Sequence, residues 1–206
     1  MNNPVKLVKC SLTRPEPLRY ALTPTPWGYV ALAGRGQLLC RLVLPQDNQA
    51  DAQHLLLTAL AQSPTKNNVP DAPQRDDTLL PELQNDLQQY FAGESAAFNV
   101  AVDVSWASTF TQAVLAACLT LTPGQTTTYA TLARHARRPN AARAVGQVMR
   151  NNRVPLIIPC HRVLGATGAL VGYSASGGLD AKARLLDHEQ SFLNVGSRLQ
   201  HQVSDK

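Results

Sequence analysis

The chain has 206 residues, of which 44% are apolar, so it can bury the core of one large domain or two small ones. It carries no charged-then-apolar leader, and no apolar run approaches the roughly 20 residues that span a bilayer. These features exclude a membrane protein and predict a cytoplasmic protein, or a nuclear one if the source is eukaryotic.

Charge is distributed unevenly along the chain. Residues 104–179 contain seven arginines and no acidic residue, although the formal net charge of the whole chain is only +5. A long segment of this kind produces a positive field that suits a polyanion. The alternative is a solvated basic face that has no partner.

The four cysteines, Cys10, Cys40, Cys118 and Cys160, are scattered and form no CxxC pair. In a reducing compartment they are free thiols, and the first three are expected to be small buried hydrophobes. We expect no metal site, because zinc needs four ligands and the N-terminal part offers only Cys10, Cys40 and His54.

The first hundred residues predict a small α/β domain that ends near residue 105 and contains no evident chemistry. Residues 26–45 predict two strands joined at a turn over 34–36, and 51–63 has helical spacing. Residues 64–78 are polar and include three prolines, which predicts a loop.

A second helix and a further strand complete this predicted domain. Pro81 opens the helix, Gly93 ends it, and four apolar or aromatic residues share one face: Leu83, Leu87, Tyr90 and Phe91. Strict alternation in 98–104 predicts a half-buried strand, with these residues on the buried side: Phe98, Val100, Val102 and Val104.

Short helices are predicted after the strand. The first covers 109–120, and the second begins after the threonines at 126–128 and runs to Arg137. Asn140 is expected to cap a third helix over 141–150. Two short helices joined by a tight turn, the second rich in arginine, have the form of a helix-turn-helix.

The third helix has an unusual exposed face, which would include Ala141, Ala142, Ala144 and Gly146, with Arg143 alone projecting. Small residues let a helix backbone approach its partner closely, which suits the narrow minor groove of DNA with one arginine inserted as a wedge. The alternative is that these residues pack against a neighbouring helix.

The sequence PLIIPCHRV places Cys160 directly before His161 and Arg162. A cysteine acts as a nucleophile in its thiolate form, which an electropositive neighbourhood favours. Pro155 and Pro159 bracket an apolar run that predicts a short buried strand, which delivers the cysteine to a rigid loop. In a strand, successive side chains point to opposite faces, so His161 could reach Cys160 only at a turn or through a water.

A general base needs an orienting partner, and the best carboxylates lie on the helix predicted over 177–190. There Leu179, Ala183 and Leu186 make an apolar face, and Glu189 follows in register. The acidic residues nearest to the cysteine are all on this helix: Asp180, Asp187 and Glu189. A Cys–His–Glu relay is therefore a candidate.

Two other chemistries use residues of the same kinds. A zinc deaminase requires a second cysteine where Val163 stands and an upstream HxE, which the chain lacks, so it is excluded. A cysteine hydrolase that pairs Cys160 with His135 or His188 stays open, but it gives the basic helices no purpose.

Together, the stretch TTTYATLARHARRPNAARAVGQVMRNNRVPLIIPCHRV and the later GALVGY and AKARLLDHE resemble the O6-alkylguanine–DNA alkyltransferases. The matching residues are most frequent between Phe110 and Glu189. It implies a ribonuclease H-like α/β domain over 1–105, a mostly α-helical helix-turn-helix alkyltransferase domain over 106–193, and a tail over 194–206.

The resemblance implies DNA repair by direct reversal. Such a protein binds duplex DNA in the minor groove, flips out the nucleotide that carries O6-alkylguanine, and takes the alkyl group onto its own cysteine in one irreversible step. It implies a monomer without a cofactor, and it leaves thymine O4 open as a second substrate. The alternatives are a non-catalytic binder of alkylated DNA that recruits other repair factors, and a transcription regulator whose cysteine senses alkylation.

The resemblance also implies roles for particular residues. Cys160 is the nucleophile, His161 deprotonates it through a water, and Glu189 orients His161. Tyr129 presses on the target phosphate and helps to protonate O6, and Asn152 holds the active-site strand.

Further implied roles concern DNA and substrate. Arg143 fills the gap that the flipped base leaves, with Tyr129, Ala141, Ala142, Ala144 and Gly146 along the DNA. The backbone carbonyls of Cys160 and Val163 accept the guanine amino group. The implied substrate pocket consists of Val163, Tyr173, Ser174, Ser176 and Lys182.

The chain departs from the family pattern at several positions. Arg153 stands where the family usually has proline, which is expected to loosen the hinge at Asn152. The turn before Tyr129 is slightly shorter than usual. The segment SASGGL is longer than the usual SGGL, so either Ser174 or Ser176 could face O6, and the accepted alkyl size is open.

Overall fold

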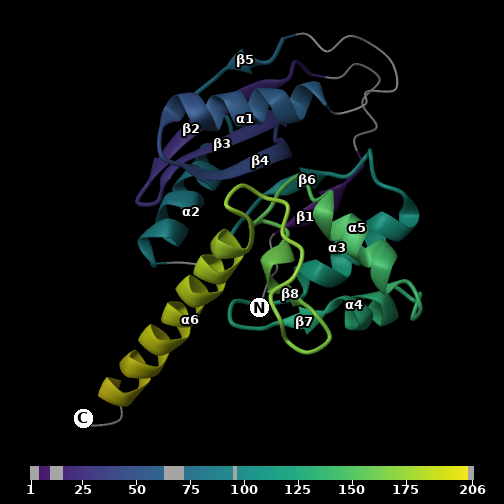
Figure 1. Ribbon diagram of the computed structural model, residues 1–206. Coiled ribbons are helices and arrows are strands. Elements are labelled where there is room, and N and C mark those ends of the chain that lie inside the picture. Colours follow the sequence, from purple (N-terminus) through teal and green to yellow (C-terminus); the bar gives the residue numbers. More distant parts are fainter. Residues whose placement is uncertain (1–4, 10–15, 63–71, 95–96, 204–206) are drawn as a thin grey trace.

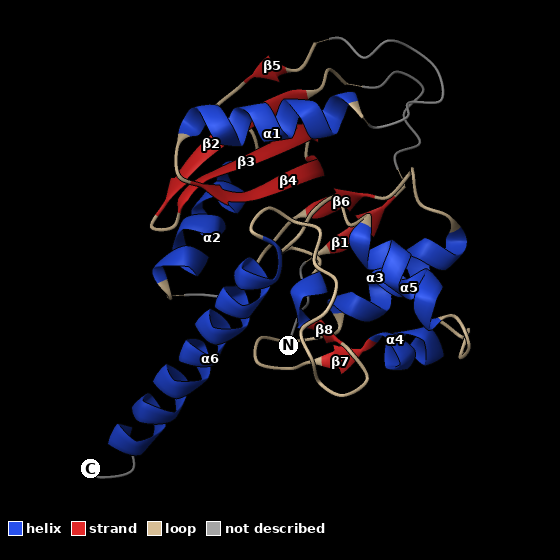
Figure 2. Ribbon diagram, in the orientation of Figure 1, coloured by secondary structure: helices blue, strands red, loops and turns tan. Residues whose placement is uncertain are grey.

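The computed structural model describes residues 5–9, 16–62, 72–94 and 97–203, with side chains as far as 192. An N-terminal α/β domain is followed by a mostly α-helical domain, as predicted (Figures 1 and 2). No helix in the described residues is long and apolar enough to cross a membrane. Cys10 lies outside the described residues.

The N-terminal domain is built on a six-stranded sheet in the order β1-β6-β4-β3-β2-β5. The strands are β1 (Lys6–Val8), β2 (Arg19–Thr25), β3 (Gly28–Arg35), β4 (Leu38–Gln46), β5 (Gln74–Arg75) and β6 (Ala101–Asp103). Strands β2, β3 and β4 form an antiparallel meander, and β6 runs parallel to both β1 and β4. The sequence did not predict β2, which contains Pro24.

The predicted hairpin is present, but its turn is shifted. The strands run to Arg35 and from Leu38, so Gly36 lies in the turn and adopts a left-handed φ of 53°. Gly34, which was expected in the turn, instead lies within β3 opposite Arg19. A side chain at Gly34 would collide with the carbonyl of Leu38, so close strand approach explains this glycine.

Two helices cover opposite faces of the sheet. Helix α1 (Gln49–Ala61) buries Ala52 and Leu56 against one face. Helix α2 (Pro81–Ala92) buries its predicted face against the other: Leu83, Leu87, Tyr90 and Phe91. It ends at Gly93, as predicted, with a φ of 82°.

The predicted strand at 98–104 is shorter than expected, since only Ala101–Asp103 pairs as β6. Its alternating pattern is confirmed, because all four predicted side chains are buried: Phe98, Val100, Val102 and Val104. The buried side chains therefore extend beyond the three residues that pair as β6.

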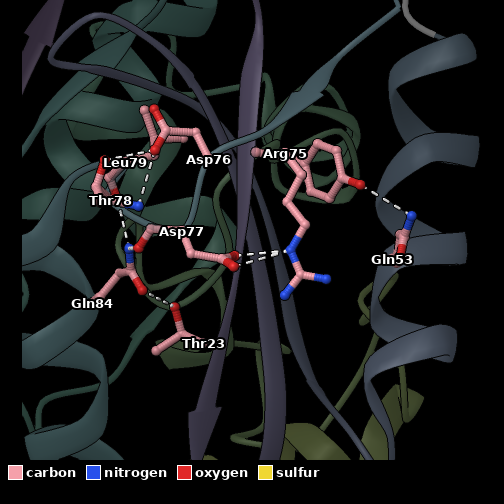
Figure 3. A network of polar contacts seen from close by, with 9 residues as sticks. Thr23, Gln53, Arg75, Asp76, Asp77, Thr78, Leu79 and Gln84 are labelled. Carbon is pink, nitrogen blue, oxygen red and sulfur yellow. Dashed lines mark hydrogen bonds and ion pairs between the residues drawn. The ribbon is translucent and has the colours of Figure 1, made fainter.

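Polar contacts fix the chain between β5 and α2 (Figure 3). Thr23 donates to Gln84 Oε1 at 2.9 Å, and the amide of Gln84 donates to the carbonyl of Asp77 at 2.9 Å. Thr78 donates to Asp76 at 2.6 Å. The loop predicted over 64–78 is partly wrong, because β5 pairs with β2; residues 63–71 lie outside the described residues.

The C-terminal domain combines short helices, of which α3 and α5 lie beside the β1–β6 edge of the sheet, with a two-stranded sheet and the long helix α6 (Figure 1). Its elements are α3 (Thr109–Leu119), β7 (Thr127–Thr128), α4 (Tyr129–His135), α5 (Ala142–Arg150), the 3-10 helix η1 (Cys160–Arg162), β8 (Val163–Leu164) and α6 (Gly178–Val203). Strands β7 and β8 pair in parallel, which joins the start of α4 to the segment after η1. Helix α6 continues to Val203 through most of the expected tail.

Helices α4 and α5 pack together as the predicted helix pair, with two local corrections. Helix α4 ends at His135, because Arg137 adopts a left-handed φ of 57° and breaks the helix before the predicted end. Asn140 does not cap α5: the capping position is Ala141, which makes no side-chain hydrogen bond.

The two domains share one apolar core. It runs from Leu32 and Phe91 in the first domain to Leu115, Val145 and Leu185 in the second. The backbone of β4 also reaches across, since the amide of Leu42 donates to the carbonyl of Arg153 at 2.9 Å. A shared core holds the two domains in a fixed relation, so groups from both can form one site.

Candidate active site

Cys160 is presented by a turn and not by the predicted strand. Residues 156–158 form no strand: Leu156 has a φ of 74°, and the only pairing is an isolated bridge between Pro155 and Ile158. The two prolines restrict the backbone, and the chain doubles back before Cys160 begins η1. The thiol lies almost fully buried at the start of this turn.

The side chain of Asn152 holds this turn closed through two hydrogen bonds. Its Nδ2 donates to the carbonyl of Ile158 at 2.8 Å, and its Oδ1 accepts from the amide of Val154 at 3.1 Å. Both ends of the side chain are thus used to hold the segment that leads to Cys160. Arg153, which follows it, leaves these contacts intact.

The carboxylate of Glu189 is the centre of a buried polar cluster. Its Oε1 lies 2.8 Å from Nε2 of His161, 2.6 Å from Nη2 of Arg162 and 3.1 Å from the hydroxyl of Tyr90, while Oε2 accepts from Nε of Arg162 at 2.8 Å. Burial alone would raise the pKa of Glu189, but the hydrogen bonds from His161 and Arg162 lower it to about 2. The group is therefore ionised at neutral pH.

Helix α6 brings Glu189 into the core on a face that differs from the predicted one. Leu179, at 44% exposed, lies on the surface. The buried positions are Lys182, Leu185 and Glu189, which follow the three- and four-residue spacing of one helix face. The predicted apolar face is wrong by one position, because Lys182 is buried and belongs to the inner face.

The hydrogen bond to Glu189 fixes the tautomer of His161. Because Glu189 is ionised, Nε2 of His161 carries the hydrogen and donates it, which leaves a lone pair on Nδ1. Nδ1 is buried and has no hydrogen-bond partner among the described residues. Burial lowers the pKa of His161, so the ring is neutral at pH 7 with Nδ1 available to accept a proton.

The thiol of Cys160 is protonated in the resting protein. Burial raises its pKa, and this outweighs the hydrogen bond from Asn152 and the charge of Lys182, which act in the opposite direction. Lys182 itself is held beside the site, since its Nζ donates to the carbonyls of Val163 at 2.6 Å and Val171 at 2.9 Å. A base must therefore remove the proton before the sulfur can react.

A pocket of about 580 Å³ opens beside the helix-turn-helix and is lined by Tyr129, Arg143 and Tyr173. The hydroxyl of Tyr129 lies 3.2 Å from the carbonyl of Val171 and 3.3 Å from that of Gly172. The hydroxyl of Tyr173 is buried and has no partner among the described residues. Unsatisfied buried groups of this kind are suited to bind a substrate or a water.

The small residues of α5 divide between the pocket and the core. Ala142 and Gly146 line the pocket, and Arg143 and Ala144 are exposed. Ala141 packs against the core, so the expected exposed face is wrong at this position. Packing against the core explains the small side chain of Ala141. Ala142, Arg143, Ala144 and Gly146 remain accessible to a partner.

The two serines of the longer loop have different partners. Ser174 Oγ donates to the carbonyl of Arg150 at 2.6 Å, and Ser176 Oγ lies 3.1 Å from Oε1 of Gln46. Ser174 lines both the pocket and a second cavity that reaches Cys160, whereas Ser176 lines only the second. Each therefore lies near the expected substrate region.

Neither histidine of the hydrolase alternative joins Cys160. His135 is exposed at the end of α4. His188 Nε2 pairs with the carbonyl of Tyr90 at 2.7 Å, and its ring packs edge-on against Trp27. In the described part of the chain no cluster of ligands could hold a metal ion, and none of Cys40, Cys118 and Cys160 forms a disulfide.

Two residues of the site were missed by the sequence analysis. Tyr90 was assigned to the core of a domain expected to lack chemistry, yet its hydroxyl bonds to Glu189. Arg162 was noted only as a neighbour of Cys160, yet it is 5% exposed and binds Glu189 through two nitrogens. A buried tyrosine hydroxyl requires an acceptor, so the predicted burial of Tyr90 was a signal that it has a partner. The sequence did not indicate that Arg162 is buried, which is what requires an acidic partner for it.

The fold and the site define a two-domain protein with a buried cysteine, a histidine–glutamate pair and an arginine-bearing helix-turn-helix. Residues 18–104 match the family model described as 6-O-methylguanine DNA methyltransferase, ribonuclease-like domain. Residues 109–191 match the model described as 6-O-methylguanine DNA methyltransferase, DNA binding domain.

Whole-chain relatives agree with these matches. The methylated-DNA–protein-cysteine methyltransferase of Mycobacterium tuberculosis is 34% identical over 84% of this chain and 93% of its own. The constitutive one of Bacillus subtilis is 32% identical over 83% of this chain and 94% of its own. Two crystal structures, of the Mycobacterium tuberculosis O6-methylguanine methyltransferase and of Mycobacterium tuberculosis OGT in complex with DNA, each give a TM-score of 0.66. The first structure is 34% identical to this chain, and the match covers 84% of this chain and 93% of the crystallised chain. The second is 32% identical, and the match covers 84% of this chain and 94% of the crystallised chain. The chain belongs to the 6-O-methylguanine DNA methyltransferase family, as the sequence motifs predicted.

Variants that remove different members of the Glu189 cluster should lose different amounts of stability. Tyr90→Phe removes one donor and should lower the free energy of unfolding by about 1 kcal/mol. Glu189→Gln should cost about 3–5 kcal/mol, because it leaves Arg162 buried without its counter-charge. Urea unfolding of both variants measures the difference. Tyr20→Phe is the control, since that hydroxyl lies outside the cluster and accepts from Gln53 at 3.0 Å; equal losses for all three variants would contradict the cluster's importance.

Proposed function

We propose that this protein repairs DNA by direct reversal, moving an alkyl group from guanine O6 to the sulfur of its own Cys160. One observation carries the proposal: Cys160 precedes His161, whose Nδ1 is open because Glu189 holds Nε2 at 2.8 Å. Family membership supports the same reaction. Each protein molecule reacts only once, because the thioether that forms on Cys160 is stable.

The first step of the proposed reaction is removal of the thiol proton. An alkyl ether carbon is a poor electrophile, so a thiolate is required. Nδ1 of His161 takes the proton of Cys160 through a bridging water. Glu189 stays ionised and stabilises the imidazolium that forms, while the charge of Lys182 and the hydrogen bond from Asn152 favour the thiolate.

The second step is transfer of the alkyl group. Sγ of Cys160 forms a bond to the alkyl carbon, the bond from that carbon to O6 breaks, and its electron pair remains on O6. Burial raises the pKa of Tyr129, so its hydroxyl stays protonated and can donate to the developing charge. To do so, it exchanges its present contacts with the carbonyls of Val171 and Gly172 for the substrate.

Duplex DNA carrying O6-alkylguanine is the proposed partner. Arg143 stands exposed at the rim of the pocket of about 580 Å³, and Ala142 and Gly146 let the helix backbone approach a groove closely. The absence of acidic residues over 104–179 favours the phosphate backbone. Arg143 would occupy the space of the flipped base, and that base would enter beside Tyr129 and Tyr173.

One chain carries every group that the proposed reaction uses, which supports a monomer as the working unit without a cofactor. Its compartment is the one that holds the DNA, the cytoplasm of a bacterium or the nucleus of a eukaryote. The carbonyl of Val163, expected to receive the guanine amino group, accepts from Lys182, and its second lone pair serves the base.

Transfer should be stoichiometric and confined to Cys160. Incubation with a duplex bearing labelled O6-methylguanine should place one label per molecule on the peptide that contains Cys160. Cys160→Ala should abolish the transfer and retain binding to the duplex. Cys40→Ala is the matched control, because Cys40 lies in β4 outside the site. Loss of methyl groups from DNA treated with Cys160→Ala would show that the nucleophile is wrong.

The rate of transfer should have a characteristic dependence on pH. Burial lowers the pKa of His161 below 6.5 and raises that of Cys160 above 9.0, so the neutral pair persists between these values. At saturating duplex, the rate constant should be level from pH 6.5 to 8.5 and fall at lower pH, where His161 becomes protonated and cannot accept the proton.

The variant His161→Ala provides the comparison. Without the base, Cys160 must ionise unaided, so the rate should be low and rise about tenfold per pH unit across the same interval. A wild-type rate that rises in the same way would mean that His161 does not act as the base.

A further inference from the structure

Oxygen Oε1 of Glu189 is shared by more donors than its lone pairs provide for. Nε2 of His161 lies 2.8 Å from it, Nη2 of Arg162 lies 2.6 Å from it, and the hydroxyl of Tyr90 lies 3.1 Å from it. A carboxylate oxygen offers about two lone-pair sites. The three donors therefore compete for one oxygen, and this is the oxygen through which Glu189 acts on His161.

Tyr90 can only donate in this contact. Glu189 is ionised at neutral pH, so its oxygens carry no hydrogen. Burial, followed by the charge of Glu189, raises the pKa of Tyr90, so the phenol keeps its hydrogen. The hydroxyl thus places the positive end of its O–H bond against Oε1 and draws electron density away from the acceptor of His161.

Two contacts fix Tyr90 against helix α6. Its hydroxyl donates to Glu189, and its backbone carbonyl accepts from Nε2 of His188 at 2.7 Å. Its ring is fully buried, with its centroid 5.5 Å from that of Phe98 and 5.6 Å from that of Phe192. Because both the backbone and the ring are held, the hydroxyl stays at Oε1.

The groups around His161 make Glu189 the source of its basicity. Burial, the largest effect, lowers the pKa of His161, and the charges of Arg162 and Lys182 lower it further. The hydrogen bond and the charge of Glu189 raise it. Several other titratable groups of this buried region are uncharged, because burial raises their pKa: Tyr90, Cys118, Tyr129, Cys160 and Tyr173. A change at the carboxylate of Glu189 therefore passes to His161.

We propose that Tyr90 is a positioning residue of the transfer reaction: by sharing Oε1 of Glu189, it weakens the bond that makes His161 basic, and so keeps this base neutral over a wider pH range. The inference rests on the proposed function and assigns the N-terminal domain a part in it. A general base works best when its pKa lies near the operating pH, since a stronger base is already protonated. Without Tyr90, Glu189 would attract the hydrogen on Nε2 more strongly and favour the imidazolium.

The alternative is that Tyr90 only satisfies a lone pair of a buried carboxylate. That role predicts lower stability when the hydroxyl is removed, and a lower rate at every pH if the site is displaced. It predicts no change in the proton affinity of His161. The two interpretations therefore differ in the pKa of His161 and in the pH dependence of transfer.

Nitrogen-15 NMR titration of the free protein measures the pKa of His161 without any substrate. Tyr90→Phe removes the hydroxyl and keeps the ring, so the pKa of His161 should rise by about half a unit. Replacement of Tyr90 by difluorotyrosine makes the hydroxyl a stronger donor, so the pKa should fall. Tyr20→Phe is the matched control: its hydroxyl accepts from Gln53 within the N-terminal domain, and its loss should leave the pKa unchanged.

The rate of transfer from a duplex bearing O6-methylguanine should follow the same shifts. At saturating duplex, the pH at which the rate constant falls to half of its level value should be about half a unit higher in Tyr90→Phe than in the wild type. At pH 8 the two rates should agree within about twofold, because His161 is neutral in both proteins.

Three results would overturn the inference. The pKa of His161 could fail to rise in Tyr90→Phe, or it could shift in the same direction for phenylalanine and difluorotyrosine. The rate of Tyr90→Phe could also be lowered by one factor at every pH, with an unmoved midpoint, which is the result of a purely structural role. Absence of transfer by the wild-type protein, with the pKa shifted as expected, would instead contradict the proposed function, and the part of Tyr90 in the reaction would fall with it.

Discussion

The carboxylate of Glu189 is the contact on which the rest of the site depends. Three donors from two separate segments converge on it: His161 and Arg162 from η1, and Tyr90 from α2 of the first domain. Breaking a buried pair is costly, but a buried pair often adds little net stability compared with apolar packing. Its value here is chemical. It fixes which nitrogen of His161 carries the hydrogen, and so leaves the other nitrogen free to act as a base.

The same constraint explains why a two-domain architecture is needed. The N-terminal domain was expected to contain no chemistry, yet it supplies the hydroxyl of Tyr90 to Glu189. A continuous apolar core keeps these groups in place relative to the catalytic turn. Separation of the domains would therefore expose Glu189.

Sequence reasoning predicted what depends on local pattern. Spacing and motifs were enough to predict the α/β and helical domains, the buried face of α2, and the helix that carries Glu189 after Cys160 and His161. Sequence reasoning failed where contacts between distant parts of the chain decide the local structure. The segment 156–158 looks like a buried strand, but its prolines and the contacts of Asn152 close it into a turn. The inner face of α6 was misplaced because Lys182, which is ordinarily a surface residue, satisfies its ammonium with two backbone carbonyls. The partner of Tyr90 was missed because nothing local indicates that its hydroxyl meets Glu189 of the second domain.

The central claim is that Glu189 holds His161 neutral, with the hydrogen on Nε2 and a bare Nδ1. Nitrogen-15 NMR of the histidine side chains, with His161 assigned through His161→Gln, tests this most directly. At pH 7 the account predicts one protonated and one unprotonated ring nitrogen, the protonated one being Nε2. A hydrogen on Nδ1, or a doubly protonated ring at pH 7, would contradict it.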